Sequence, residues 1–183
     1  SGSSSWDVDT LVVEHILPGA AYHDAFKAKL DLVADFLNSL KTTDGVKIPI
    51  IFRPWHEMNG EWFWWGEGHR THEQYKQLFR YTIDYLKNEK QVDNILVAYS
   101  PDRMFDTPEE YLNWYPGDEY VDVIGVDIYN NSNDQKSNIE HFSKIVKEMG
   151  TKKLLAMTEN GPIPDVDSMA TDEAVWSWWM PWY

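Results

Sequence analysis

The chain has 183 residues, enough for one domain, or part of one, with a sizeable core. Its 30 acidic and 16 basic residues give a net charge near −14, which makes nucleic acid a poor partner, and its scattered charges leave no apolar run long enough to span a bilayer. The lack of cysteine excludes disulfides, zinc–thiolate sites and a cysteine nucleophile. The chain starts at Ser1 without a signal-peptide pattern, so we expect a processed form or a fragment.

The first half of the chain alternates between helical and strand patterns. Apolar residues recur at helical spacing over residues 22–41, and a short apolar run over 48–52 predicts a buried strand. Thr71 followed by Gln74 is a capping-box pattern and predicts the start of a second helix. A second buried strand is predicted over 95–99.

The second half continues the alternation. Thr107 is placed to cap a short helix, and a third strand is predicted over 121–129. A capped helix is then expected over 137–150, followed by strands over 153–157 and 175–180.

The absence of any hairpin signal predicts right-handed βα units on a parallel sheet, either an open doubly wound sheet or a (β/α)8 barrel. Neither Gly-rich phosphate-binding fingerprint is present. Polar residues instead follow the predicted strands, where barrel enzymes place their chemistry, which favours the α/β fold of a (β/α)8 TIM barrel. These residues are Glu57, Asp102, Asp127, Tyr129 and Glu159.

The number of predicted strands is too small for a complete barrel. Such a barrel typically needs about 250 residues and rarely fewer than about 200, whereas five strands are predicted here and a helix precedes the first. We therefore expect residues 1–183 to form part of a catalytic domain, barrel strands four to eight, without the first three strands.

Aromatic residues are unusually frequent, with ten Trp, ten Tyr and seven Phe. Some of them must fill the core, but several Trp residues cluster beside polar groups, as in the segment that holds Trp62, Trp64 and Trp65. Flat aromatic faces beside hydrogen-bonding groups suit sugar rings, which present C–H faces and hydroxyl edges. The composition therefore favours a carbohydrate ligand.

The segment 50–66 carries the strongest functional pattern. Strand alternation would place Arg53, Trp55 and Glu57 on one side and Phe52, Pro54 and His56 on the other. A buried Arg needs an acceptor, so we hypothesise that Arg53 holds a catalytic carboxylate. The alternative is a structural Arg–Glu pair at the end of a strand.

A second carboxylate, Glu159, ends the fourth predicted strand. In a barrel its strand lies three away from that of Glu57, so both side chains can reach one central pocket. Two carboxylates across a Trp-lined pocket are typical of a glycosidase, in which one donates a proton and the other attacks the anomeric carbon.

Three motifs resemble family 26 of the glycoside hydrolases: RPWHEMNGEWFWWG, WYPGDEYVDVIGVDIY and the strand end TENG. Members of this family are retaining (β/α)8 enzymes, chiefly endo-β-1,4-mannanases. The resemblance implies that Glu57 is the acid/base and Glu159 the nucleophile. It also implies that Tyr129 hydrogen-bonds the nucleophile and that His56 positions the acid/base and contacts the sugar. The implied sugar-contacting tryptophans are Trp62, Trp65 and Trp182, and the supporting residues are Arg53 and Asp127.

The resemblance thus implies double displacement on mannan, galactomannan or glucomannan, with no cofactor and no metal. The carboxyls of Glu57 and Glu159 are expected to lie about 5–5.5 Å apart. Burial near Trp and the second carboxylate is expected to raise the pKa of Glu57, while Arg53 and Tyr129 keep Glu159 ionised.

Two alternatives remain. The same scaffold in other members cleaves mixed-linkage glucan or xylan, and a partial barrel could be an inert carbohydrate-binding fragment. A polymeric substrate implies an extracellular or periplasmic location, and the sequence leaves protein partners open.

Overall fold

The computed structural model describes residues 11–150 and 152–182 and contains a parallel five-stranded sheet in the order β1-β2-β3-β4-β5. Each strand therefore pairs with its successor along the chain. A doubly wound sheet reverses its strand order at a switch point, whereas a barrel does not. The order confirms the barrel interpretation, with five strands forming a half-barrel. The strands are β1 (Ile50–Phe52), β2 (Ile95–Tyr99), β3 (Val123–Ile128), β4 (Leu154–Asn160) and β5 (Trp179–Pro181).

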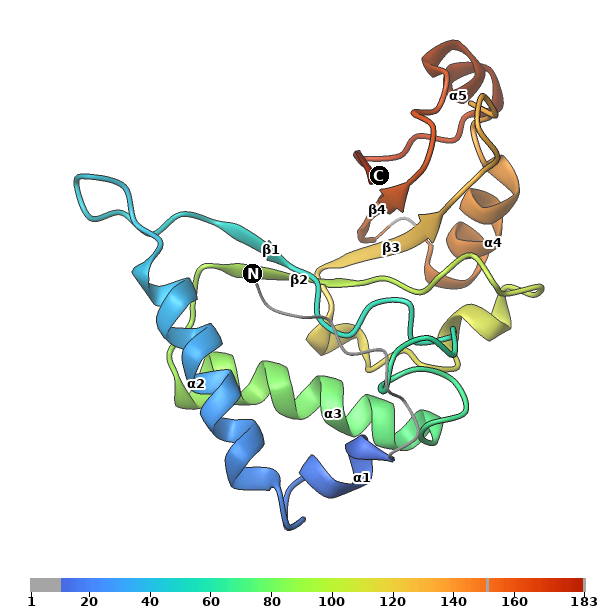
Figure 1. Cartoon of the computed structure of the whole chain (residues 1–183). Coiled ribbons are helices and arrows are strands. Elements are labelled where there is room, and N and C mark those ends of the chain that lie inside the picture. Colours follow the sequence, from blue (N-terminus) through green and yellow to red (C-terminus); the bar gives the residue numbers. More distant parts are fainter. Residues whose placement is uncertain (1–10, 151, 183) are drawn as a thin grey trace.

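Helices connect the strands and cover the outside of the sheet, as expected for βα units. Figure 1 shows α1, α2 and α3 gathered on one side of β1 and β2, with α4 beside β3. The α-helices are α1 (Val12–Ile16), α2 (His23–Ser39), α3 (His72–Asp84), α4 (Ile139–Met149) and α5 (Val166–Asp172). A π-helical turn, Tyr85–Glu89, extends α3, and 3₁₀ turns cover Glu109–Leu112 and Asp118–Tyr120.

Most predicted elements are present, but at the C-terminal end one helix was not predicted and the start of one predicted strand is wrong. The sequence analysis missed α5, whose first turn is capped by Asp165 accepting from the Ser168 N–H at 3.0 Å. The last strand begins at Trp179 and not at residue 175, because Val175 is exposed and Trp176 turns into the core, where its Nε1–H donates to the Ser137 carbonyl.

Helix α2 has an apolar inner face and an unusually apolar outer face. Phe26, Leu30 and other residues at helical spacing are buried against the rest of the molecule. On the opposite side Leu32 and Phe36 remain 64% and 62% exposed. Strand β1, which follows α2, has β2 as its only partner in the described sheet, and Ile51 in it is also exposed.

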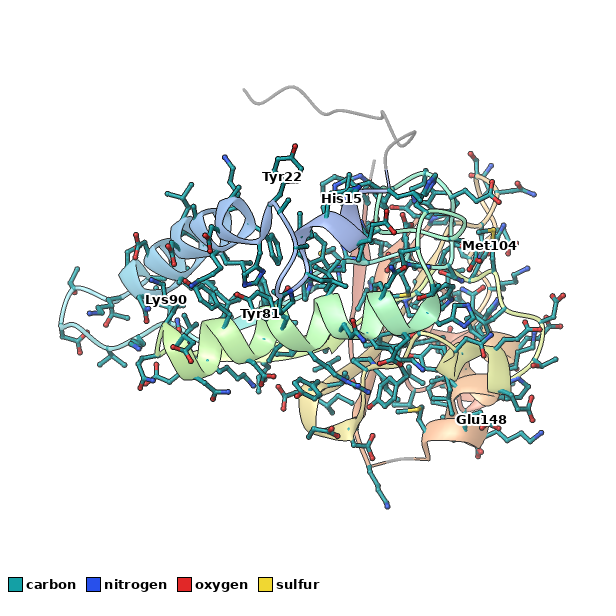
Figure 2. All side chains as sticks on the ribbon, turned by 90° about the horizontal axis from the view of Figure 1, so that it is seen from below. His15, Tyr22, Tyr81, Lys90, Met104 and Glu148 are labelled. Carbon is teal, nitrogen blue, oxygen red and sulfur yellow. The ribbon has the colours of Figure 1, made fainter. Side chains whose placement is uncertain are left out.

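Polar contacts fasten α2 to α3. Figure 2 shows Tyr81 between these two helices, where its hydroxyl lies 3.1 Å from His23 Nε2. The Tyr85 hydroxyl donates to Asp31 at 2.7 Å, and Lys90 forms an ion pair with the same carboxylate. These contacts fix the outer layer behind β1.

The core between the sheet and α3 contains tyrosines whose hydroxyls are all satisfied. Tyr99 donates to the Tyr111 carbonyl at 2.8 Å, Tyr111 donates to the Gly125 carbonyl at 2.9 Å, and Tyr75 donates to the Trp55 carbonyl at 3.0 Å. Buried polar groups need such partners. The bonds therefore tie the loops after the strands to the packed interior.

Across residues 11–150 and 152–182, the helices are all too short or too polar to pass through a bilayer.

The capping box of α3 gives a test of the local fold. The Thr71 hydroxyl accepts from the Gln74 N–H at 3.1 Å, and the Gln74 side chain accepts from the Thr71 N–H at 2.9 Å. We expect Thr71→Ala to lower the free energy of unfolding by about 1 kcal/mol, measured by urea denaturation. Thr107→Ala is the matched control, because the contact of that hydroxyl with the Glu110 N–H is 3.4 Å, and it should cost less. Equal losses would contradict the assignment.

Candidate active site

The chain turns sharply after β1. Trp55 and Glu57 have φ values of 54° and 51°, in the left-handed region that residues with a side chain rarely adopt. Such conformations cost about 1–3 kcal/mol each and concentrate at functional sites. The Glu57 N–H donates to the Ser100 carbonyl at 2.8 Å, so the neighbouring strand end holds this strained turn.

This turn corrects the predicted alternation of side chains. Trp55 was expected to share a side with Arg53 and Glu57, but it points toward the helices and donates from Nε1 to Thr82 Oγ1 at 3.1 Å. His56 was expected on the opposite side, but it lines the same cleft as Arg53 and Glu57. The period-two pattern ends with β1 at Phe52, because positive φ values reverse the direction of the backbone.

The carboxyl ends of the strands surround a cleft of about 770 Å³. Seven of the nine predicted site residues line it: Arg53, His56, Glu57, Trp62, Tyr129, Glu159 and Trp182. Asp127 lies fully buried beneath them. Trp65 does not line the cleft, and two residues that were not proposed for the site, Phe63 and Asp102, do.

The Arg53 guanidinium connects two carboxylates. Its Nη1 lies 3.0 Å from Asp127 Oδ2, and its Nη2 forms an ion pair with Glu159 Oε1. Arg53 thus does contact carboxylates, which are Glu159 and Asp127, and the hypothesis that it holds a catalytic one stays a prediction. Charge-assisted bonds of this kind are stronger than neutral ones.

A bulge in the pairing of β3 with β4 brings Asp127 and Glu159 together. Val126 pairs with Met157, but the next pair is Asp127 with Glu159, so Thr158 is an extra residue in β4. The bulge lets the side chain of Thr158 reach Asp127 and makes Glu159 the pairing partner of Asp127. No local sequence pattern announces this shift.

Asp127 is held by two hydroxyls that the sequence analysis missed. Ser100 Oγ and Thr158 Oγ1 both donate to Asp127 Oδ1 at 2.7 Å. Burial raises the pKa of Asp127 to about 6, although Arg53 and the hydroxyls act in the opposite direction. A Cβ on Gly125 would lie 2.3 Å from Thr158 Cγ2, so the glycine leaves room for this arrangement.

Glu159 receives donors on both oxygens. Arg53 binds Oε1, and the Tyr129 hydroxyl donates to Oε2 at 2.5 Å. His56 Nε2 lies 3.8 Å from Oε1. Burial and the hydrogen bond to Glu159 raise the pKa of Tyr129, so the phenol remains a donor at neutral pH. The contact expected between Tyr129 and Glu159 is thus present.

Glu57 has a different environment. Burial raises its pKa to about 7, and the negative charges of Asp127, Glu159 and Asp102 act in the same direction. The Trp62 Nε1–H donates to Glu57 Oε2 at 2.8 Å and opposes the rise. The predicted upward shift is confirmed, and Asp127 contributes more to it than Glu159 does.

His56 is neutral at pH 7, because burial and the Arg53 charge lower its pKa to about 4. Its ring packs against Phe63 with centroids 5.0 Å apart. Trp65 lies behind this pair: its Nε1–H donates to the His56 carbonyl at 2.8 Å, and its ring stacks on Phe63 at 4.3 Å. Trp65 therefore supports the wall of the cleft, a position that differs from the expected sugar contact.

Two tryptophans reach the cleft from opposite ends of the sheet. Trp62 packs on Gly60, where an added Cβ would lie 2.2 Å from the indole ring, so Gly60 leaves space for this ring. Trp182 follows β5 and is 59% exposed, and its N–H donates to the Asn160 carbonyl at 2.9 Å. Both indoles are available to an extended ligand.

The described residues also contain one group with the composition of a metal site. Ligand atoms of His56, Glu57 and Asp127 lie within 4.8 Å of one another. Both Asp127 oxygens, however, already accept hydrogen bonds, and the Arg53 guanidinium beside them would repel a cation. The arrangement favours an uncharged ligand, with a proton donor on one wall and a carboxylate held by a cation on the other.

The influence of Asp127 on Glu57 can be measured directly. At pH 7 most Asp127 is ionised, and its negative charge disfavours ionisation of Glu57. Asp127→Asn removes this charge, so we expect the pKa of Glu57 to fall below about 7 in a carbon-13 NMR titration of the glutamate carboxyls. Asp134→Asn, outside the cleft, should leave it unchanged. An unchanged or higher pKa in Asp127→Asn would refute this account.

The sequence model described as "Glycosyl hydrolase family 26" matches residues 2–183. A mannan endo-1,4-beta-mannosidase of Bifidobacterium adolescentis is 42% identical over 161 residues, 83% of this chain and 16% of that protein. One of Bacillus subtilis is 32% identical over 92% of this chain and 45% of its own length. Endoglucanase H of Acetivibrio thermocellus is 37% identical over 90 residues, 44% of this chain and 9% of its own length.

Solved structures agree with the sequence relatives. The catalytic domain of a Bacillus sp. JAMB-750 GH26 endo-beta-1,4-mannanase has a TM-score of 0.85 at 35% identity, over all of this chain and 53% of the other. The GH26 beta-mannanase BoMan26A of Bacteroides ovatus has a TM-score of 0.84 at 40% identity, over all of this chain and 56% of the other. The chain thus spans about half the length of these two solved chains, and less than half the length of the Bifidobacterium and Bacillus subtilis mannosidases. Because the family model covers nearly every residue, the chain belongs to glycosyl hydrolase family 26.

Proposed function

We propose that this chain carries the reaction centre of a retaining, endo-acting β-mannanase that cleaves β-1,4-mannosidic bonds in mannan, galactomannan or glucomannan. The observation that carries the proposal is the pair Glu57 and Glu159 on one cleft, one with a raised pKa and the other bound by Arg53 and Tyr129. The names of the relatives support mannan as the substrate.

In the first step Glu57 donates its proton to the glycosidic oxygen as the bond to the anomeric carbon breaks. Glu159 attacks that carbon with a carboxylate oxygen and forms a glycosyl-enzyme. In the second step Glu57, now ionised, removes a proton from water, and the hydroxide oxygen displaces Glu159. The acid is then protonated again, so protons and charges balance over the cycle.

The surrounding residues favour these two steps. Burial keeps Glu57 protonated up to about pH 7, which lets it act as an acid. Arg53 and Tyr129 orient the Glu159 carboxylate and leave its charge partly compensated. Asp127 positions Arg53, and neutral His56 offers a ring nitrogen to a sugar hydroxyl.

The shape of the surface supports cleavage within a polymer. A second hollow of about 520 Å³ shares Tyr129 and Trp182 with the main cleft and is lined by amide and hydroxyl side chains such as Asn130 and Ser132. The two hollows adjoin at Tyr129 and Trp182, so the second one offers room for sugars on the Glu159 side of the cleaved bond. Trp62 and Trp182 supply flat faces for stacking.

A second polymer is a competing candidate. The similarity to Endoglucanase H favours a glucan as the alternative substrate of the same chemistry, with xylan as a further possibility on this scaffold. A non-catalytic carbohydrate-binding role is the other alternative, and it predicts sugar binding without turnover. Because polymeric mannan cannot enter a cell, we place the protein outside the cytoplasm, in the extracellular space or the periplasm.

The central test compares Glu159→Ala with the unchanged protein. We expect reducing-sugar release from mannan to fall by about three orders of magnitude or more, because no nucleophile remains. Glu140→Ala, an exposed acid in the first turn of α4, is the matched control and should keep full activity.

Further measurements complete this test. In a retaining reaction, NMR should show the first product with the anomeric configuration of the substrate. Release from glucan or xylan above that from mannan would overturn the substrate assignment. Binding of mannan without any release would favour the non-catalytic alternative.

The pH dependence follows from the state of Glu57. The acid must be protonated in the first step, so kcat/KM should fall as pH rises through the pKa of about 7. Initial rates on a soluble manno-oligosaccharide between pH 4 and 9 would measure this fall. A rate that stays level through pH 7 and above would contradict Glu57 as the acid.

A further inference from the structure

Asp102 is the carboxylate on the cleft that the proposed mechanism does not use. It follows β2, and its backbone forms a parallel bridge with Asp127. The Asp127 N–H donates to the Pro101 carbonyl at 2.9 Å, and the Arg103 N–H donates to the Asp127 carbonyl at 3.1 Å. The backbone on either side of Asp102 is therefore anchored to the strand that supports the reaction centre.

Asn59 fixes the same residue from the β1 loop. Its Oδ1 accepts from the Asp102 N–H at 2.8 Å, and its Nδ2 donates to the Asp102 carbonyl at 2.8 Å and to the Met104 carbonyl at 3.1 Å. A side-chain amide that satisfies both backbone groups of one residue restricts its position strongly. Asn59 is two residues from Glu57, so the clamp also fixes Asp102 relative to the acid.

The carboxylate itself has a free acceptor. Asp102 Oδ1 accepts from the Met104 N–H at 2.9 Å, while Oδ2 accepts no hydrogen bond from the residues that the structure describes. A half-buried carboxylate oxygen is stabilised by a hydrogen-bond donor, so Oδ2 can accept one from a ligand. The cleft that Oδ2 can reach contains the Trp62 indole and the Glu57 carboxyl, which are groups suited to a sugar.

The strand order decides which part of the substrate Asp102 meets. Glu57 follows β1, Asp102 follows β2, and Glu159 is in β4 on the far side of β3. Asp102 therefore lies on the side of the acid, where the leaving group departs, and away from the nucleophile. A carboxylate there accepts hydrogen bonds from hydroxyls, which a sugar leaving group carries and the nitrophenyl group of an aryl glycoside does not.

We propose that Asp102, held by Asn59, is a substrate-binding residue that accepts hydrogen bonds from the hydroxyls of the leaving-group sugar. The inference rests on the proposed glycosidase function and extends it by one residue. If Asp102 acts in this way, it favours substrates whose leaving group is a sugar over those with other leaving groups.

The test uses two substrates that differ in the leaving group. For mannotetraose the leaving group is a sugar, and for 4-nitrophenyl β-mannobioside it is a phenol. Asp102→Asn removes the charge but keeps an oxygen for the Met104 N–H. We expect kcat/KM to fall about tenfold on mannotetraose, through a higher KM at nearly unchanged kcat, and to change less than about twofold on the aryl glycoside. A fall in kcat with a shifted pH profile would instead show that Asp102 acts through the pKa of Glu57. Asp106→Asn, an exposed acid in the same loop, is the matched control and should change neither.

Each other outcome contradicts the inference. Equal losses on both substrates would make Asp102 a structural residue, and unchanged rates on both would show that the leaving sugar does not contact it. A wild-type protein that cleaves neither substrate would refute the proposed function. In that case tenfold weaker calorimetric binding of mannotetraose by Asp102→Asn supports the Asp102 contact, and equal binding overturns it.

Discussion

The contact of Arg53 with Asp127 and Glu159 is the interaction on which the site depends. The guanidinium comes from the end of β1 and reaches carboxylates on β3 and β4, so it ties together strands that are not neighbours in the sheet. Removing one partner from a buried ion pair leaves an uncompensated charge, which costs about 3–5 kcal/mol. The ion pairs of Arg53 therefore help to hold the strand ends around the cleft, and they also set the charge within it.

The same contact gives the two glutamates of the cleft different surroundings. Both Glu57 and Glu159 are about 90% buried, so burial alone would treat them alike. Arg53 and Tyr129 bind Glu159, whereas Glu57 receives a single neutral donor from Trp62 and faces the charge of Asp127. Asp127 thus has two effects: it holds Arg53 against Glu159 and favours the protonated form of Glu57.

Local patterns predict the parts of this site that depend on strand ends. The apolar runs located the strands, and the polar residues at their ends, Glu57, Tyr129 and Glu159, do meet in one cleft, with Asp127 buried beneath them. The expectation that a buried Arg53 needs a carboxylate partner also holds, and its partners are Asp127 and Glu159. These predictions succeed because a parallel sheet brings the carboxyl ends of its strands to one edge, whatever the details of the backbone.

The remaining features depend on backbone geometry that no periodic pattern contains. The positive φ of Trp55 reverses the expected sides of Trp55 and His56, and the bulge at Thr158 creates the hydroxyl partner of Asp127. Trp65 is one of several neighbouring tryptophans, and composition cannot tell the ring that supports the wall from the ring that lines it. The Asp165 cap of α5 follows a proline and offered a local signal that could have found that helix.

The half-barrel described above has a consequence for how such a protein can diversify. Glu57, Glu159 and their immediate partners all come from β1 to β4 and the loops that follow them. The second hollow beside Tyr129 and Trp182 is lined mainly by residues outside this group. Under the proposed function, substitutions in that lining can change which polysaccharide binds while the arrangement of the two carboxylates stays the same.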